Sequence, residues 1–161
     1  MSEIAIRAGR PEDAEAVARL CAELSAAEGA SPPAFTADMF RQHGFGPEAA
    51  FAAVVAEADG QPVGYALHHG GFDTQMGAVG RRVLDLYVAP DFREKGLGRK
   101  LLGAVARAAR AQGGSWVALQ VKPDNHAAQS FYGALGGVAD IDPTIEFKGE
   151  AFDALATPPA S

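Results

Sequence analysis

Cysteine and long apolar runs are both scarce in this chain of 161 residues. The single cysteine, Cys21, cannot form an internal disulfide or a thiolate cage for zinc, and this is typical of a protein from the reducing cytoplasm. No run approaches the roughly 18–20 apolar residues that a membrane-spanning helix needs. Residues 1–10 lack the apolar core of a secretion signal. We therefore expect a cytoplasmic protein without a membrane partner.

Positive charge is also in the minority, with 14 lysines and arginines against 20 aspartates and glutamates and a net charge of −6. Proteins that bind nucleic acids present a basic surface, so we expect no nucleic-acid partner. Hydrophobic residues make up 48% of the chain, which is enough for one domain with its own core. We predict a single domain over residues 1–156, followed by a flexible tail over residues 157–161.

The spacing of apolar residues predicts an α/β fold with the element order βααβββαβαβ. The order indicates a mixed, mostly antiparallel sheet with helices on both faces. Asp59-Gly60 lies between two apolar runs and predicts a two-residue hairpin turn. The predicted strands cover residues 3–8, 51–58, 63–69, 82–89, 115–121 and 138–147. The predicted helices cover residues 11–28, 35–43, 98–111 and 125–135.

The segment from Val88 to Leu102 carries the clearest chemical signal. A strand ends before Pro90, and a loop with two closely spaced glycines, Gly96 and Gly98, leads directly into a helix. Glycines leave the backbone N–H groups open, and together with the helix N-terminus these groups form a site for an anion such as a pyrophosphate. Positive side chains add to this attraction, namely Arg93, Lys95, Arg99 and Lys100. The plain alternative is a turn followed by a helix start.

Two stretches of sequence carry a family resemblance. Arg93-Glu94-Lys95-Gly96-Leu97-Gly98 matches the R/Q-x-x-G-x-G/A acyl-CoA loop of the GNAT superfamily of N-acetyltransferases. Residues 125–137, N-H-A-A-Q-S-F-Y-G-A-L-G-G, resemble the second signature of that superfamily, and the two motifs have its order and separation. Further short matches resemble the diamine and thialysine acetyltransferase branch, at residues 64–67, 72–74, 86–88 and 149–152.

The resemblance implies a GNAT-like fold, acetyl-CoA as co-substrate, no metal and a homodimer. It implies that the backbone of residues 93–98 holds the pyrophosphate of CoA and that Val88 pairs with pantetheine like a strand. It places Asn125 and Tyr132 near the thioester, and it places Glu28 on the acceptor side. The residues expected to bind acetyl-CoA are Leu86, Tyr87, Val88, Arg93, Glu94, Lys95, Gly96, Leu97, Gly98, Arg99 and Asn125.

Two polar residues are candidates for catalysis. Tyr132 lies on an apolar helix face, where a phenol needs a partner, and it could protonate the departing thiolate as a general acid. The alternative for Tyr132 is a half-buried core tyrosine. Asp85 lies within an apolar strand, where it could be a base, an anchor for the amine or a satisfied structural carboxylate. Cys21 is expected in the core, and no ligand set points to a metal.

These features predict an acetyl-CoA-dependent N-acetyltransferase that transfers an acetyl group to a primary amine of a small molecule by direct attack in a ternary complex. The alternatives are transfer to a protein N-terminus or lysine, and a non-catalytic acyl-CoA-binding regulatory domain. Polyamine-acetylating members of the resembled branch tend to carry two successive acidic residues where this chain has Leu84-Asp85. We therefore expect long polyamines to be poor acceptors.

Overall fold

The computed structural model describes residues 3–140, 144 and 146–158, which belong to two compact units. The first, the sheet unit (Met1–Lys122), is a layered α/β structure built on one sheet. The second, the C-terminal unit (Pro123–Ser161), contains α4 (His126–Ala134) and α5 (Glu150–Ala156). None of the helices among the described residues has both the length and the apolar character that a membrane crossing requires.

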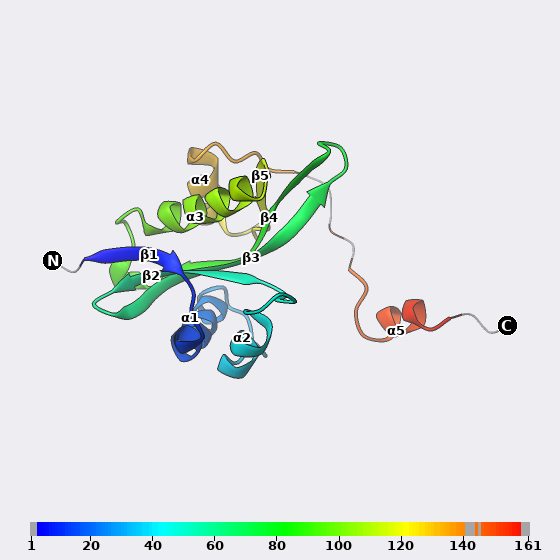
Figure 1. Cartoon of the computed structure of the whole chain (residues 1–161), viewed down its shortest axis with the longest axis horizontal. Helices are drawn as coiled ribbons and strands as arrows, with labels where there is room; N and C mark the ends of the chain where they lie inside the picture. The colour runs from blue at the N-terminus through cyan, green and yellow to red at the C-terminus, as the bar shows by residue number, and fades with distance from the viewer. Residues whose placement is uncertain (1–2, 141–143, 145, 159–161) are drawn as a thin grey trace. The chain divides into compact units, whose positions relative to one another are not determined.

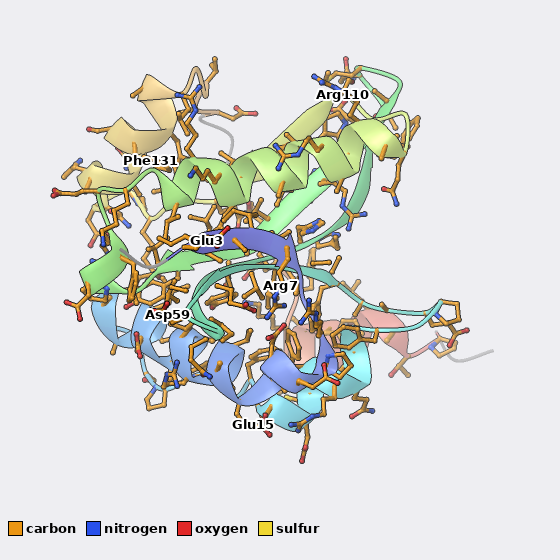
Figure 2. All side chains as sticks on the ribbon, turned by 60° about the vertical axis from the view of Figure 1, so that its left-hand side comes forward. Glu3, Arg7, Glu15, Asp59, Arg110 and Phe131 are labelled. Carbon is orange, nitrogen blue, oxygen red and sulfur yellow. The ribbon has the colours of Figure 1, made fainter. Side chains whose placement is uncertain are left out.

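The sheet has five strands in the order in which they follow one another in the chain. Neighbouring strands are antiparallel except for the last pair, which is parallel, so the predicted mixed and mostly antiparallel sheet is confirmed. Asp59 and Gly60 form the predicted turn with φ values of 50° and 78°, and Asp59 is labelled in Figure 2. The strands are β1 (Ile4–Ala8), β2 (Ala52–Ala58), β3 (Gln61–Asp73), β4 (Ala78–Val88) and β5 (Trp116–Leu119).

Helices cover both faces of the sheet, as Figure 1 shows. On one face α3 (Leu97–Ala111) packs Leu101 and Val105 against the sheet. On the other face α1 (Ala14–Ala27) and α2 (Ala37–His43) contribute Val17, Leu20 and Phe40 to a second core cluster. Each helix buries one apolar stripe, and the sheet between them is therefore apolar on both sides.

The predicted element order is confirmed as far as α4 and is wrong at the C-terminus. The described residues of the predicted strand 138–147 form no strand, and residues 141–143 and 145 lie outside the described part of the chain. The next regular element is the short helix α5, whose first turn carries Glu150 and Asp153, as the helix dipole favours. Apolar alternation alone was an insufficient signal, because a strand also needs a partner for its backbone. Of the predicted tail, residues 159–161 lie outside the description.

The hairpin of β3 and β4 is longer than its sequence indicates. We predicted that β3 ends at His69 and that β4 begins at Arg82. In the structure Gly71 pairs with Gly80, and both lie against the indole of Trp116. A Cβ atom at Gly80 would overlap the Trp116 ring, so glycine is required here for close packing rather than for a turn.

A β-bulge interrupts β4 next to the candidate residue Asp85. Leu67 pairs with Asp85 and His68 pairs with Val83, so Leu84 is an extra residue without a partner on β3. Leu84 is 52% exposed. The extra residue changes which face the following side chains occupy.

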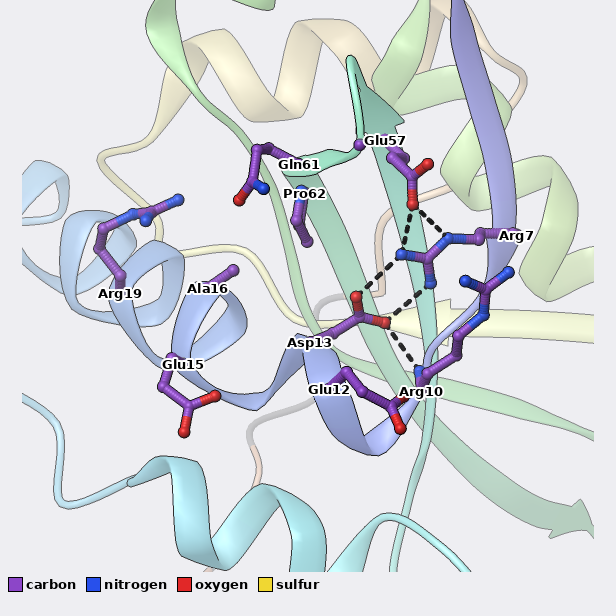
Figure 3. Close-up of a pocket in the computed structure, with 11 residues that line it drawn as sticks. Arg7, Arg10, Glu12, Asp13, Glu15, Ala16, Arg19, Glu57, Gln61 and Pro62 are labelled. Carbon is purple, nitrogen blue, oxygen red and sulfur yellow. Dashed lines mark hydrogen bonds and ion pairs between the residues drawn. The ribbon is translucent and has the colours of Figure 1, made fainter.

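Arg7 ties the edge strand β1 to the start of α1. Its guanidinium donates two hydrogen bonds of 2.8 Å to Asp13 and one of 2.7 Å from Nε to Glu57 on β2 (Figure 3). Burial alone would raise the pKa of Asp13, but the hydrogen bonds from Arg7 and from the Arg10 N–H hold it below its ordinary value. These charges line a cavity of about 570 Å³, and their mutual pairing gives it a structural role.

Candidate active site

The strand β4 leads through a short 3-10 turn, η2 (Pro90–Phe92), into the loop of residues 93–98 and then into α3. Two residues of this loop have left-handed backbone conformations, Glu94 with φ 62° and Gly96 with φ 74°. A non-glycine residue in this conformation is strained, and such strain is concentrated at functional sites. Gly96 caps α3, a helix of 15 residues. The turn thus directs the helix N-terminus towards the loop.

Open backbone donors make this loop suitable for an anion. Among the described residues no acceptor binds the N–H groups of residues 94–99. The first N–H groups of any helix lack intrahelical partners, and the helix dipole adds partial positive charge there. Exposed cationic side chains surround the loop, namely Lys95, Arg99 and Lys100. The loop therefore offers the donors and the positive charge that an anion such as a diphosphate requires.

The Arg93 side chain contacts the end of β4, unlike the other cationic side chains of the loop. Its Nε donates to the carbonyl oxygen of Val88 at 2.8 Å, and its guanidinium lies 5.3 Å from the ring centre of Tyr87. The Arg93 side chain therefore braces the loop against the end of β4. Val88 O keeps one lone pair for a second donor, and the Val88 N–H is the other group that the predicted pairing with pantetheine could use.

The edge of β4 towards β5 is open near the loop. Pairing between the two strands ends at Val83 and Leu119. Ala89 N donates to Val63 O on the other side, at 2.8 Å, so the alternation of an antiparallel pair directs the polar groups of Val88 and Leu86 away from β3. Among the described residues no strand pairs with β4 beyond Val83 on this side, so Leu86 and Val88 direct backbone groups to an edge on which an extended ligand can add.

Asp85 lies at the beginning of this open edge and is half-buried. Its Oδ2 accepts a hydrogen bond from the Tyr65 hydroxyl at 2.8 Å, and the Cys21 Sγ lies 3.6 Å from the same oxygen. Burial raises the pKa of Tyr65, which therefore stays protonated and acts as the donor. Burial likewise raises the pKa of Cys21, so the predicted core role of this thiol agrees with its environment.

Glu28, which the resemblance placed on the acceptor side, and the buried His68 both have partners in the sheet unit. Glu28 follows the last residue of α1, and its Oε2 lies 3.3 Å from Lys122 Nζ. His68 is buried and accepts a hydrogen bond from Arg81 Nε at 2.9 Å. Burial, with the Arg81 charge, lowers the pKa of His68 to about 4, so the imidazole is neutral at pH 7. Among the described residues no group of three or more His, Cys, Asp or Glu side chains is arranged for a metal.

Asn125 and Tyr132 belong to the C-terminal unit. Asn125 is the N-cap of α4, and its side-chain oxygen accepts the Ala128 N–H at 3.1 Å. Tyr132 is half-buried, and its ring makes an edge contact with Phe131, at a centroid distance of 5.1 Å. Burial raises the pKa of Tyr132, which keeps the phenol protonated at neutral pH.

Comparison of the sequence with known proteins shows the family to which this chain belongs. The sequence profile of the acetyltransferase (GNAT) family matches residues 17–136. The chain belongs to this family. It is therefore an acetyltransferase of the GNAT type. Two curated relatives are named thialysine N-epsilon-acetyltransferase. The protein from Bos taurus is 32% identical over 171 residues, which cover 97% of this chain and 99% of that one. The protein from Mus musculus is 31% identical, with the same coverage.

Solved structures share the GNAT fold. An integron cassette protein from the mobile metagenome of V. cholerae superposes with a TM-score of 0.80 at 18% identity, covering 96% of this chain and 98% of that one. The aminoglycoside N-acetyltransferase AAC(6')-Iy in complex with CoA gives 0.70 at 24% identity, with coverages of 93% and 97%. At these identities the likeness concerns the fold.

Sequence reasoning did not identify Tyr65 as a partner of Asp85. Tyr65 lies within the apolar run of β3, and a fully buried tyrosine is expected to find a partner for its hydroxyl. The sequence therefore indicates that an acceptor lies near the Tyr65 hydroxyl, but it does not indicate which residue provides it. The link between Tyr87 O–H and Glu23 Oε2, at 3.4 Å, was missed for the same reason.

Proposed function

We propose that this protein transfers the acetyl group of acetyl-CoA to a primary amine of a small molecule, by direct attack in a ternary complex. The observation that carries this proposal is the loop of residues 93–98, whose unpaired N–H groups adjoin the N-terminus of α3 and the open edge of β4. Bound acetyl-CoA would supply a thioester carbonyl that is open to attack by an amine.

The residues of this chain would bind and orient the two substrates. The loop N–H groups would hold the pyrophosphate, and the backbone of Leu86 and Val88 would align the pantetheine. Backbone N–H groups on the open edge of β4 would stabilise the negative charge that develops on the carbonyl oxygen. As the new C–N bond forms and the C–S bond breaks, Tyr132 would donate the proton that the leaving thiolate needs. The nitrogen would lose one proton to water, and the phenol would regain its proton from water. Positioning and preorganised dipoles would supply most of the rate gain.

The amine side of the site is proposed from Asp85 and from the relatives. Asp85 would receive an N–H of the acceptor, and Glu28, although paired with Lys122, lies at the C-terminal end of α1. Proteins named for thialysine share the full length of this chain, so thialysine is the first acceptor to test. As part of the same proposal the enzyme is a cytoplasmic homodimer.

The Gly98→Val variant is expected to weaken acetyl-CoA binding at least about tenfold while the protein stays folded, because a branched side chain would occupy space that the phosphates need. Gly98 is the second residue of α3. Isothermal titration calorimetry with acetyl-CoA measures the affinity, and circular dichroism checks the fold. Gly103→Val is the matched control, since it makes the same change further along the same helix. Unchanged affinity in a folded Gly98→Val protein would remove the loop from the binding site.

The pH dependence of the reaction is expected to follow the acceptor. Leu84 supplies no second carboxylate next to Asp85, so the amine has to arrive deprotonated. We expect kcat/KM at saturating acetyl-CoA to rise with pH up to the pKa of each acceptor, about 10 for an ordinary primary ammonium. Spermidine and thialysine are compared by the release of free thiol. A plateau near neutral pH with efficient spermidine turnover would show instead that the enzyme has a dedicated base.

A further inference from the structure

Among the described residues, the partners of Asp85 contact only one of its two carboxylate oxygens. Oδ2 receives the Tyr65 hydroxyl at 2.8 Å and is close to Cys21 Sγ at 3.6 Å. No donor among the described residues contacts Oδ1, and the side chain is only half-buried. A charged group in the middle of a sheet is costly, and one neutral hydroxyl does not require a charged acceptor. The free oxygen is therefore available to a ligand.

Tyr65 is well suited to fix this carboxylate. It has no exposed surface, and it is the largest fully buried side chain among the described residues. It lies directly opposite Tyr87 in the β3–β4 pair, and its hydroxyl reaches diagonally to Asp85, the residue two before Tyr87. Because packing fixes the ring, the O–H can hold Asp85 in a single rotamer. Asp85 lies on the same face as Tyr65 because it is two residues from Tyr87 in a stretch of regular register, which ends at the bulge at Leu84.

We propose that Tyr65 is a positioning residue of the acceptor site, which holds Oδ2 of Asp85 so that Oδ1 can accept an N–H of the incoming amine. A neutral primary amine has two N–H groups and one lone pair. Donation of one N–H to Oδ1 would orient the lone pair for attack and would transfer no proton to Asp85. This inference rests on the proposed function and adds the residue that orients its acceptor.

The test is a double-mutant cycle on Tyr65 and Asp85, with thialysine and acetyl-CoA as substrates. Tyr65→Phe removes only the hydroxyl, and we expect kcat/KM for the amine to fall about tenfold, as the loss of a hydrogen bond to a charged group predicts. The affinity for acetyl-CoA is expected to stay within about twofold. In an Asp85→Ala background, Tyr65→Phe is expected to have no further effect, because there is no carboxylate left to position.

Two controls separate positioning from stability. Val17→Ala makes a cavity in the same core cluster without touching Asp85, and it is expected to lower the melting temperature while kcat/KM is unchanged. Asp85→Asn replaces Asp85→Ala if that variant does not fold. Its one oxygen accepts the Tyr65 O–H, and its NH2 group cannot accept an N–H of the amine, so the effect of Tyr65→Phe is again expected to be small.

Three outcomes would overturn the inference. One is full amine kcat/KM in a folded Tyr65→Phe enzyme. Another is a double variant whose loss in kcat/KM equals the product of the losses in Tyr65→Phe and Asp85→Ala, which would mean that the two residues act independently. Either would leave the proposed function standing as long as the wild type acetylates thialysine. A wild type that binds acetyl-CoA but releases no thiol with any amine would overturn the proposed function, and this inference with it.

Discussion

Tyr132→Phe is expected to lower kcat by a factor of roughly 10–10³, because a general acid contributes to the rate by about this amount. The phenol is half-buried, and burial raises the pKa of Tyr132, so the proton that it would donate is present throughout the neutral range. This protonated form is lost only as the pH rises above that increased pKa. The KM for acetyl-CoA is expected to change little, since the hydroxyl acts on the leaving group rather than in binding.

The measurement is single-turnover thiol release, so that product release does not mask the chemical step. Gly133→Ala provides the control on the adjacent residue of α4. A Cβ atom there meets no heavy atom of the described residues within 4 Å, and alanine favours the helix. Full kcat in Tyr132→Phe when chemistry limits the rate would assign this tyrosine a structural role and would leave the acid to water.

The second large effect is expected in stability. Gly80→Ala is predicted to lower the free energy of unfolding by about 3 kcal/mol, at the upper end of overpacking effects. The new Cβ would overlap the Trp116 ring and lie 2.5 Å from Trp116 O. The ring cannot move freely, because Trp116 Nε1 donates to Ala78 O at 2.9 Å and the Arg82 guanidinium lies 5.3 Å from the ring centre.

Thermal unfolding measures this effect, and a loss of about 3 kcal/mol corresponds to a decrease of roughly 6–12 °C in the midpoint for a chain of this size. Gly103→Ala is the matched control. Its Cβ would approach only the flexible end of Arg107, at 3.3 Å, and the gain in helix propensity predicts a stability equal to the wild type or up to about 1 kcal/mol higher. If Gly80→Ala unfolded at the same temperature as the wild type, β5 would have to move aside without a loss in the free energy of unfolding.

The structural features that the sequence predicted correctly are local in the chain. The loop of residues 93–98 is continuous, and its glycines, its cations and the following helix can be identified without knowing any tertiary contact. The same holds for the turn at Asp59-Gly60, where two left-handed residues connect neighbouring strands. Composition and spacing are sufficient where all interacting groups are close in sequence.

The parts that were missed depend on distant residues. Gly71 and Gly80 lay outside the predicted strands, because the sequence does not reveal that Trp116 packs against them. The partner of Asp85 comes from β3, 20 residues earlier, through a diagonal contact between paired strands. The predicted final strand was wrong within the described residues, because alternation does not say whether a neighbouring strand exists.

The bulge at Leu84 also has a consequence for how this enzyme could diverge. Val83 packs with the α3 core, while Asp85 contacts groups on the opposite face, so the change of face between them is absorbed by Leu84. Leu84 itself is largely exposed and belongs to neither core cluster. A single substitution there can change the charge beside Asp85 at little cost in folding free energy. Natural variation at this one position could therefore change which amine is accepted without requiring any change in the two core clusters.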